Sequence, residues 1–591
     1  MRQLLALLFL AIATPLASGN PGLIPWQPYG DAAFAQARAD GRYVLLELEA
    51  VWCHWCHVMD ARTWTDPTVA TAVAEHYVPV RADHDARPDL AERYRDYGWP
   101  AIVILDGEGR EIVKRAGYIP PDGMARLLAA VVADPSPEAA PAAEPTVWAS
   151  SPLLDATIRA ELERRWMATH DAARGGLKGF QKIVDRDATE YALLRAAAGD
   201  TVSARMARAD LAGARRLLDP VWGGVYQYST GGDWKRPHYE KLAFIQADYL
   251  RLFALGYAAF GDPRDRAAIG AIHAYLRRFL RSPEGAFYTS QDADLRPGEH
   301  SAAYFALDDA GRLKRGLPRV DRSIYARENG LIAAALIQAH AATGEPALLE
   351  GAIRAVEYMG ATRRLPGGGY AHGAADPAGP YLADNLALLR ALVALHGATG
   401  ERRWLTEATA TADFIAARFA RPDSPGFRTA VPAGPLPPVA TLEENLALAR
   451  VANLLSAYSG EPRHRAMAES ALRYLATPQV ALARLSDPGI LIADRELAND
   501  PAHLTVVGGR DDPAARRLFA AAARWPVVYK RVEWWDRSEG PLPNPDVAYP
   551  ELGRAAAFVC AEGRCSRPLF SVEDLLALAA EGQGKGQRHA P

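Results

Sequence analysis

The sequence predicts a multidomain protein: a small α/β domain comes first, an all-α toroid of helical hairpins follows, and a small α/β module ends the chain. Three observations lead to this prediction. Up to residue 133, strand-like apolar runs alternate with helical segments around a Cys-x-x-Cys pair. The next stretch repeats long Ala/Leu-rich segments with short breaks. After residue 480 the apolar runs become short again, as in a mixed sheet.

Composition and the N-terminal segment indicate the general class of protein. With 591 residues, 49% hydrophobic residues and a net charge of −3, the chain suits several packed domains and gives no sign of nucleic-acid binding. Residues 1–19 resemble a secretory signal peptide. Arg2 is followed by an apolar run at 4–12 that is too short to span a bilayer, and small residues at 17–19 suit cleavage. We therefore expect an exported, periplasmic protein without stable membrane insertion.

The first domain is expected at residues 20–133, followed by a Pro/Ala-rich linker at 134–148. A buried strand at 43–49 leads into the cysteine pair, and helix-compatible residues continue to residue 63. The remaining expected elements are a helix from Pro67, the strand YVPVRADHD, a β-hairpin around the DGEG turn in PAIVILDGEGREIVKRAGY, and a closing helix MARLLAAVVA. This order of elements around a CxxC pair is typical of a thioredoxin-like domain.

Residues 149–480 repeat one unit, a helical hairpin followed by a loop rich in glycine and aromatic residues. The breaks within the hairpins read AAGD, AFGDP, ATGEP, ATGE and YSGEP, and the loops read GGLKGF, GGVYQYS, EGAFYTS, GGGYAHG and PGFRTA. The repeat of roughly 50–60 residues, with one longer insertion near 295–320, predicts an (α/α)₆ toroid. The Gly-aromatic loops would then gather at one end, around a central cleft.

The last module is expected at residues 481–583, before a disordered tail at 584–591. The segments HLTVVGG, DPAARRLFAAAA, PVVYKRVEWW, AAAFVC and VEDLLALAA alternate between strand and helix patterns. Cys560 and Cys565 lie close together after a strand, so they form either a local disulfide or a second exchanging dithiol. The sequence leaves both alternatives open.

The decapeptide VWCHWCHVMD, residues 51–60, supports three interpretations. CxxC fits a redox dithiol, CxxCH is the attachment motif of c-type haem, and the extra histidine adds a Cys/His zinc site. The preceding strand favours the dithiol, because it places Cys53 at a helix N-terminus that stabilises a thiolate. Haem would need a distal ligand and a large apolar pocket, and zinc would need four well-spaced ligands. We therefore expect no metal or cofactor; a purely structural disulfide remains an alternative.

Five residues make up the predicted redox site. Cys53 would be the exposed nucleophile and Cys56 the resolving thiol. His54, when charged, would favour the Cys53 thiolate. Glu47 would exchange a proton with the resolving thiol if it is buried on its strand, and an exposed carboxylate is the alternative. Pro100 starts the hairpin, where a cis-proline would shape a groove for a substrate strand.

Polar residues near the Gly-aromatic loops make the cleft a candidate sugar site. Glu240 with Asp292 or Asp294 would offer the acid and base of glycoside hydrolysis, and His238 with His372 would offer the two bases of an epimerase. The full set of candidates is Trp234, His238, Glu240, Asp292, Asp294, Glu328, His372 and Asp384. The alternative is that these residues cap helices and hold neighbouring repeats together.

Longer stretches resemble the spermatogenesis-associated thioredoxin-domain proteins and their bacterial relatives. Four segments resemble the N-terminal domain of that family: WCHWCHVM, DPTVA, RADHDARPDLAERY and GWP. Four more resemble its later segments: GGVYQYSTGGDWKRPHYEKLAFIQADYL, AFYTSQDAD, YLADNLALLRALVALHGATGE and AFVCAEGRCSRPL. The resemblance implies a thioredoxin-like domain joined to a domain similar to six-hairpin glycosidases and N-acylglucosamine 2-epimerases. Trp52 and Glu47 depart from the family toward disulfide isomerases, and Gln291 replaces the usual glutamate of the AFYTSQDAD segment.

Three functional hypotheses follow. The first is an exported thiol–disulfide oxidoreductase that acts on protein thiols or disulfides, with a toroid that binds a partner or a glycan. The second is a carbohydrate-active enzyme, epimerase-like or glycoside hydrolase-like, with an ancillary thioredoxin domain. The third is a non-catalytic binding scaffold.

Overall fold

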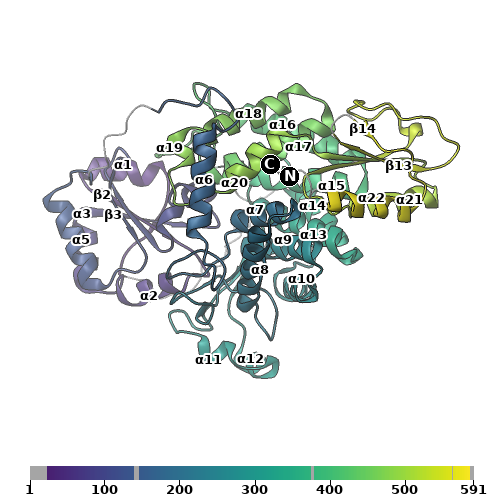
Figure 1. Cartoon of the computed structure of the whole chain (residues 1–591). Helices are drawn as coiled ribbons and strands as arrows, with labels where there is room; N and C mark the ends of the chain where they lie inside the picture. The colour runs from purple at the N-terminus through teal and green to yellow at the C-terminus, as the bar shows by residue number, and fades with distance from the viewer. Residues whose placement is uncertain (1–22, 139–145, 375–378, 562–563, 586–591) are drawn as a thin grey trace, which may run out of the picture.

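The N-terminal domain, the helical toroid and the C-terminal module follow one another in space in the computed structural model, with the toroid in the middle (Figure 1). The structure describes residues 23–138, 146–374, 379–561 and 564–585. The expected signal peptide therefore lies outside the described residues. Most of the expected tail does too, although the last helix, α22 (Val572–Lys585), includes its first two residues. No helix in the described parts of the chain is long and apolar enough to cross a bilayer.

The N-terminal domain is thioredoxin-like, as predicted. Its five-stranded sheet has the order β1-β3-β2-β4-β5, with β2 parallel to β3 and antiparallel to β4. The strands are β1 (Gln27–Pro28), β2 (Tyr43–Glu49), β3 (Tyr77–Asp83), β4 (Ala101–Leu105) and β5 (Glu111–Ala116). The helices are α1 (Asp31–Asp40), α2 (His54–Arg62), α3 (Pro67–His76), α4 (Pro88–Arg93) and α5 (Pro121–Ala133). Two hydrophobic clusters bury β2 and β4 almost completely, which explains their continuous apolar runs.

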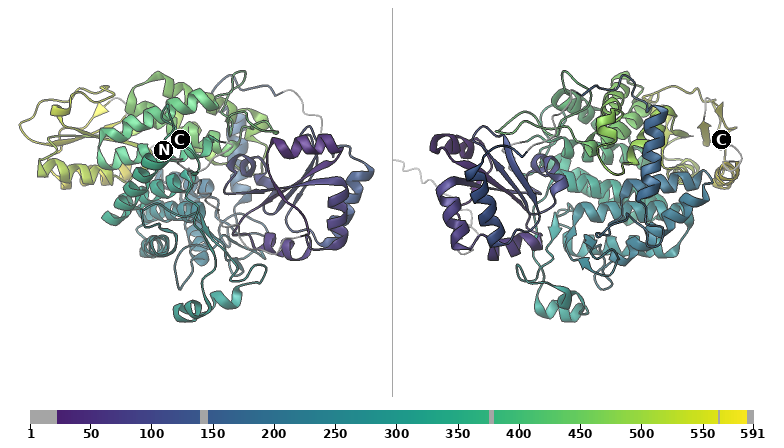
Figure 2. Two further views of the ribbon diagram at one scale, coloured as in Figure 1. Left: turned by 180° about the vertical axis from the view of Figure 1, so that it is seen from behind. Right: turned by 60° about the vertical axis from the view of Figure 1, so that its left-hand side comes forward.

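The toroid is a closed ring of inner and outer helices, which confirms the (α/α)₆ prediction. The inner helices are α7 (Arg186–Ala197), α9 (Ala243–Phe260), α13 (Ala326–Thr343), α15 (Leu382–Thr399), α17 (Leu442–Ser459) and α20 (Gly489–Ala498). The outer helices are α6 (Ala156–Thr169), α8 (Thr201–Ala214), α10 (Pro263–Tyr275), α14 (Pro346–Thr362), α16 (Arg402–Phe419) and α18 (Pro462–Leu475). Each inner helix contacts the next, and α20 contacts α7, so the ring closes. Figure 2 shows the toroid between the two α/β parts from two further sides.

The Gly-aromatic loops pack between the repeats, which corrects the expectation that they line an open cleft. Phe287 and Tyr370 are buried, and the backbone N–H of each donates to an asparagine on the next inner helix, Asn329 at 2.7 Å and Asn385 at 2.8 Å. The glycines permit this packing, because a Cβ atom on Gly223 would lie 2.2 Å from a backbone oxygen of α10. The recurrent loops therefore connect each repeat to the next inner helix and stabilise the ring.

The predicted insertion between α10 and α13 carries two short helices, α11 (Ala302–Phe305) and α12 (Asp309–Arg315), which project from the ring (Figure 1). It also contributes to a small sheet of β8 (Lys241–Leu242), β9 (Ser290–Gln291) and β10 (Val320–Asp321). This sheet lies at the end of the toroid that faces the N-terminal domain. It positions the acidic residues that follow β9.

The C-terminal module closes the opposite end of the toroid, where it packs on α15 and α17. Its sheet has the order β12-β11-β13-β14. The strands are β11 (Ala502–Val507), β12 (Lys530–Trp535), β13 (Ala556–Ala561) and β14 (Arg564–Cys565), and α21 (Pro513–Ala523) joins β11 to β12. Cys560 and Cys565 face each other on β13 and β14 and form a disulfide. An exchanging dithiol also forms this bond when it is oxidised, so the role of the pair stays a prediction.

Candidate functional site

The first cysteine pair lies at the first turn of α2, as the sequence predicts. Cys53 is the N-cap residue of α2, and its Sγ atom accepts a hydrogen bond from the backbone N–H of Cys56 at 3.1 Å. The two sulfur atoms form a disulfide. The peptide bond between Trp99 and Pro100 is cis, as expected. This domain therefore carries a CxxC disulfide in the setting of a thioredoxin-type oxidoreductase.

Burial of the disulfide corrects one prediction. The sequence predicts an exposed Cys53, whereas Cys53 is 3% exposed and Cys56 is 1% exposed. The reason is tertiary: both cysteines and Trp52 belong to one hydrophobic cluster with the core of the toroid. The loop end of the toroid thus covers the face of the N-terminal domain that carries the start of α2.

His54, His57 and Asp294 join the two domains, and we call this group the interdomain bridge. Nδ1 of His54 lies 2.8 Å from one carboxylate oxygen of Asp294, and Nδ1 of His57 lies 3.1 Å from the other. Nε2 of His57 is 3.8 Å from Asp292. Asp294 comes from the toroid insertion, so a predicted sugar-site residue holds both histidines of the CHWCH motif.

The electrostatics of the interdomain bridge favour charged partners. Burial raises the pKa of Asp294, but the hydrogen bonds from His54 and His57 outweigh burial and bring this pKa down to about 2. Burial lowers the pKa of His57, but its hydrogen bond to Asp294 and the charge of Asp292 outweigh burial, and the net pKa is raised. The bridge therefore stabilises an imidazolium next to a carboxylate at the edge of the disulfide.

Glu47 is buried on β2, which excludes the exposed alternative. Its carboxylate accepts a hydrogen bond from Nε1 of Trp64 at 2.8 Å and pairs with Arg81 at 2.7 Å. Arg81 also pairs with Asp60 at 2.6 Å. Burial raises the pKa of Glu47 and the charge of Arg81 opposes it, with a net rise. A raised pKa is the direction that the predicted role of a proton-exchanging carboxyl requires.

Two more predicted sugar-site residues lie close to the interdomain bridge. The ring of His238 stacks on Tyr228 with centroids 4.2 Å apart. Burial, together with the nearby charges of His54 and His300, lowers the pKa of His238 to about 4. Burial raises the pKa of Glu240 to about 7, and one of its carboxylate oxygens has no hydrogen-bond partner. Half of the predicted sugar-site residues therefore lie close to the predicted redox site.

His372 makes a second contact with the N-terminal domain, and Asp384 and Glu328 of the toroid lie near it. Nδ1 of His372 lies 2.9 Å from Asp384, and Nε2 lies 2.7 Å from the backbone oxygen of Asp85. Burial lowers the pKa of His372, but Asp384 outweighs it and raises the pKa to about 9. Glu328 is buried against Arg327, 3.0 Å away. Because both ring nitrogens of His372 are engaged, the role of a free epimerase base does not fit this residue.

Trp234 corrects another prediction, because it lies in the wall of the toroid and not at a binding surface. It is 6% exposed, and its Nε1 atom donates to the backbone oxygen of Arg174 at 2.8 Å. A Cβ atom on Gly213 would lie 2.6 Å from its ring. Trp234 therefore fills the space between neighbouring segments.

One cluster among the described residues has the composition of a metal site. Single ligand atoms of His57, Asp292 and Asp294 lie within 4.8 Å of one another. Three protein ligands is the number that a catalytic zinc site uses. Both oxygens of Asp294 also take part in hydrogen bonds with the histidines.

Sequence reasoning missed the second half of the interface, His84, Asp85 and Trp99. Asp85 accepts a hydrogen bond from Nε1 of Trp52 at 2.8 Å and lies 2.7 Å from Nδ1 of His84. The ring of Trp99 meets His84 edge-on with centroids 4.4 Å apart. The signal that could have identified this group is the polar pair His84-Asp85 directly after the apolar strand in YVPVRADHD.

Parts of the chain are similar to known proteins. Residues 16–133 match the Thioredox_DsbH family, described as a protein of unknown function, DUF255. Spermatogenesis-associated protein 20 of Homo sapiens is 24% identical over 316 residues, 47% of this chain and 40% of that protein. The uncharacterized protein B0495.5 of Caenorhabditis elegans is 23% identical over 318 residues, 48% of this chain and 43% of that protein. The chain thus matches less than half the length of these curated relatives.

Two further comparisons concern single domains. Thiol:disulfide interchange protein DsbD 2 of Pseudomonas aeruginosa is 35% identical over 104 residues, 17% of this chain and 18% of that protein. A solved sugar epimerase from a ruminal bacterium is 14% identical with a TM-score of 0.43, and the match covers 54% of this chain and 85% of that chain. The N-terminal domain is therefore similar to a DUF255 thioredoxin domain, and about half of the chain is similar to the spermatogenesis-associated proteins.

Proposed function

We propose that the protein is an exported, periplasmic thiol–disulfide oxidoreductase whose partners are protein thiols or disulfides. The observation that carries the proposal is the Cys53–Cys56 pair at the N-terminus of α2, after a buried strand and beside the cis-proline loop. A helix N-terminus lowers the pKa of a thiol from about 8.5 into a range of about 3.5–7.5, which makes the thiolate available at neutral pH.

The exchange proceeds in two steps. In the reducing direction, the Cys53 thiolate attacks a partner disulfide, forms a mixed disulfide and releases one partner thiolate, which takes up a proton. Cys56, after losing its proton to Glu47, attacks the Cys53 sulfur and releases the second partner thiolate. The partner gains two electrons and the Cys53–Cys56 disulfide forms. The oxidising direction is the reverse.

Burial of the disulfide gives the toroid a role in this proposal. A partner sulfur must approach Cys53 in line with a breaking S–S bond, yet Cys53 is 3% exposed beneath the toroid loops. Exchange with a protein therefore requires the toroid to move away from α2. In the proposal the toroid gates the disulfide, and binding of a partner or glycan to the toroid favours the open form.

Trapping of a mixed disulfide tests the proposal. Cys56→Ser leaves Cys53 unable to release a captured partner, so we expect covalent adducts in a periplasmic extract, which non-reducing gels and mass spectrometry would detect. Cys53→Ser/Cys56→Ser is the matched control and should give none, whereas Cys560→Ser/Cys565→Ser combined with Cys56→Ser should trap as before. Absence of adducts from Cys56→Ser, together with no disulfide reductase activity of the wild type, would refute the proposal.

A carbohydrate-active enzyme is the second candidate, and one observation favours it. Glu240 has a pKa raised to about 7 by burial, while Asp294 has a pKa of about 2 because hydrogen bonds from two histidines outweigh its burial. Carboxyl groups with separated pKa values are typical of an acid and a base in sugar chemistry. A screen of sugars for turnover, with Glu240→Gln as the control, tests it; binding without turnover would favour a non-catalytic scaffold.

A further inference from the structure

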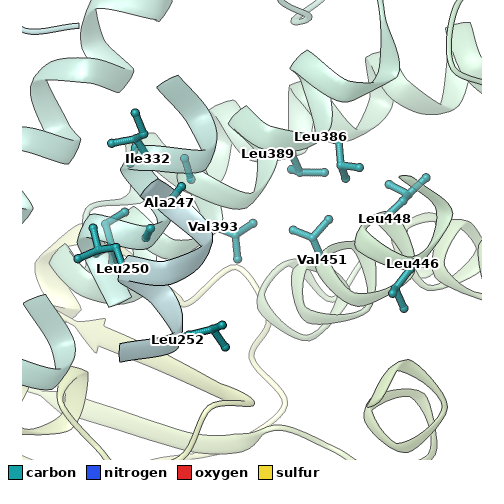
Figure 3. Packing of buried hydrophobic residues seen from close by; sticks show 14 of the residues in the cluster. Ala247, Leu250, Leu252, Ile332, Leu386, Leu389, Val393, Leu446, Leu448 and Val451 are labelled. Carbon is teal, nitrogen blue, oxygen red and sulfur yellow. The ribbon is translucent and has the colours of Figure 1, made fainter. Parts of the chain in front are cut away.

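The bore of the toroid holds a cavity that is separate from the disulfide. Its volume is about 210 Å³, which is room for roughly seven water molecules at about 30 Å³ each. The inner helices form its walls, and Tyr529, Lys530 and Val532 of the C-terminal module line one end. Val393 of α15 and Val451 of α17, which come from neighbouring inner helices, both line the cavity (Figure 3). No residue of the N-terminal domain lines it.

Nearly every charged side chain on the cavity wall has a partner. Lys530 donates to the backbone oxygens of Ala523 and Trp525, and Glu443 pairs with Arg484. The other pairs are Arg251–Glu190 at 2.6 Å, Arg450–Glu190 at 2.7 Å, Arg450–Glu496 at 2.8 Å, Arg186–Asp187 at 3.2 Å and Arg186–Asp248 at 3.0 Å.

Arg390 of α15 is the exception. Within the described parts of the chain, its guanidinium donates no hydrogen bond and forms no ion pair, although it lines the cavity. Burial, and then the charges of Arg251, Arg186 and Arg450, lower its pKa to about 9, while the charge of Asp248 opposes this shift. A guanidinium on a cavity wall without a protein partner can pair with an anion, and charge-assisted hydrogen bonds of this kind are among the strong ones.

We propose that this cavity binds a small organic anion, whose carboxylate or phosphate group pairs with the guanidinium of Arg390. The planar fork of arginine matches both oxyanions in a bidentate geometry. The apolar wall around Val393, Val451 and Leu446 accepts the neutral part of the ligand, which favours an organic anion over a bare inorganic ion. This inference stands independently of the thiol–disulfide proposal.

Calorimetric titration of the full-length protein tests the inference. The probes are inorganic phosphate and D-glucuronate, in a chloride-free buffer, with D-glucose as the neutral comparison. We expect one-to-one binding of at least one anion and no binding of glucose. Tighter binding of phosphate would indicate a phosphate ester as the natural ligand class, and tighter binding of D-glucuronate would indicate a carboxylate. Arg390→Met should weaken binding at least about tenfold, because one charge-assisted bidentate pair is lost. Arg390→Lys keeps the charge without the fork and should weaken binding less.

The controls distinguish a ligand site from a structural arginine. Arg205→Met removes an exposed arginine of the outer helix α8 and should leave anion binding unchanged. Without anion, Arg390→Met should melt at the same temperature as the wild type or higher, because the half-buried guanidinium has no hydrogen bond or ion pair to lose among the described residues. Three outcomes would overturn the inference. The first is a lower melting temperature of Arg390→Met without anion, and the second is equal anion affinity of this variant and the wild type. The third is that the wild type binds neither probe at 10 mM. Disulfide reductase activity of the wild type and of Arg390→Met is measured in parallel. Failure of the anion site leaves this activity in place, whereas failure of the proposed redox function shows as its absence from the wild type.

Discussion

The two disulfides of the molecule differ in their surroundings. Cys53–Cys56 caps a helix and lies beside two histidines that a toroid aspartate holds. Cys560–Cys565 joins two paired strands at the edge of a sheet, and Cys565 is exposed. A helix N-terminus stabilises a thiolate, whereas a cross-strand bridge holds a local turn. We therefore expect the more accessible pair to be structural and the buried pair to be the redox-active one.

The largest expected difference between the pairs is in activity. Cys53→Ser removes the nucleophile, so we expect reduction of a disulfide substrate to fall at least roughly 100-fold. Cys560→Ser/Cys565→Ser should stay within about twofold of the wild type, because this pair lies in the module at the far end of the toroid (Figure 1). A coupled assay of disulfide reduction measures both variants. Equal losses in the two variants would show that the second pair also exchanges electrons.

The interdomain bridge should control access to the first pair. Asp294→Ala removes the partner of both His54 and His57, and hydrogen bonds to charged groups contribute about 1.5–3 kcal/mol each. We therefore expect a phosphine reductant to open Cys53–Cys56 at least about tenfold faster in this variant, with no change at Cys560–Cys565. Alkylation of the released thiols followed by mass spectrometry measures both rates.

Asp423→Ala removes an exposed carboxylate of the toroid and is the matched control for that experiment. It should reduce at the wild-type rate. If Asp294→Ala and Asp423→Ala behave alike, the toroid does not gate the disulfide.

The smallest expected effect is on pH dependence. The pKa of His57 is raised, and that of His372 is raised to about 9. The contacts of these two histidines therefore stabilise the closed form fully at a pH below the ordinary histidine pKa of about 6.5. This stabilisation is lost as pH rises through the raised values, while Asp294, with a pKa of about 2, stays charged. We expect the reduction rate of Cys53–Cys56 relative to Cys560–Cys565 to rise about threefold from roughly pH 6 to 9. A constant ratio contradicts this prediction, and Asp294→Ala should flatten the rise.

The fold was accessible from the sequence because its signals are local. The strand before CxxC, the hairpin around DGEG and the repeated helical pairs each follow from periodicity and turn residues within a few positions. The Glu47–Arg81 pair is an intermediate case. These residues are paired in register on β2 and β3, so a strand alignment would have suggested their contact.

The site was only partly accessible, because it is assembled from distant segments. Asp294 was selected as a sugar-site candidate, yet it holds histidines that precede it by more than 230 residues. The spacing of the Gly-aromatic loops predicted the toroid correctly. It did not reveal that Asn329 and Asn385 tie those loops into the wall, which leaves them unavailable as platforms for a sugar.

The sequence by itself determined the CxxC pair, its position at the start of a helix, the toroid and the module behind it, since these depend on neighbouring residues and regular repeats. Only the tertiary structure decided that the toroid covers the disulfide and that Asp294 contacts both histidines of the CHWCH motif. It also decided that Arg390 faces a cavity without a partner among the residues that the structure describes. The physical reason is that burial and charge compensation depend on which surfaces meet in space, and a one-dimensional pattern does not contain that information.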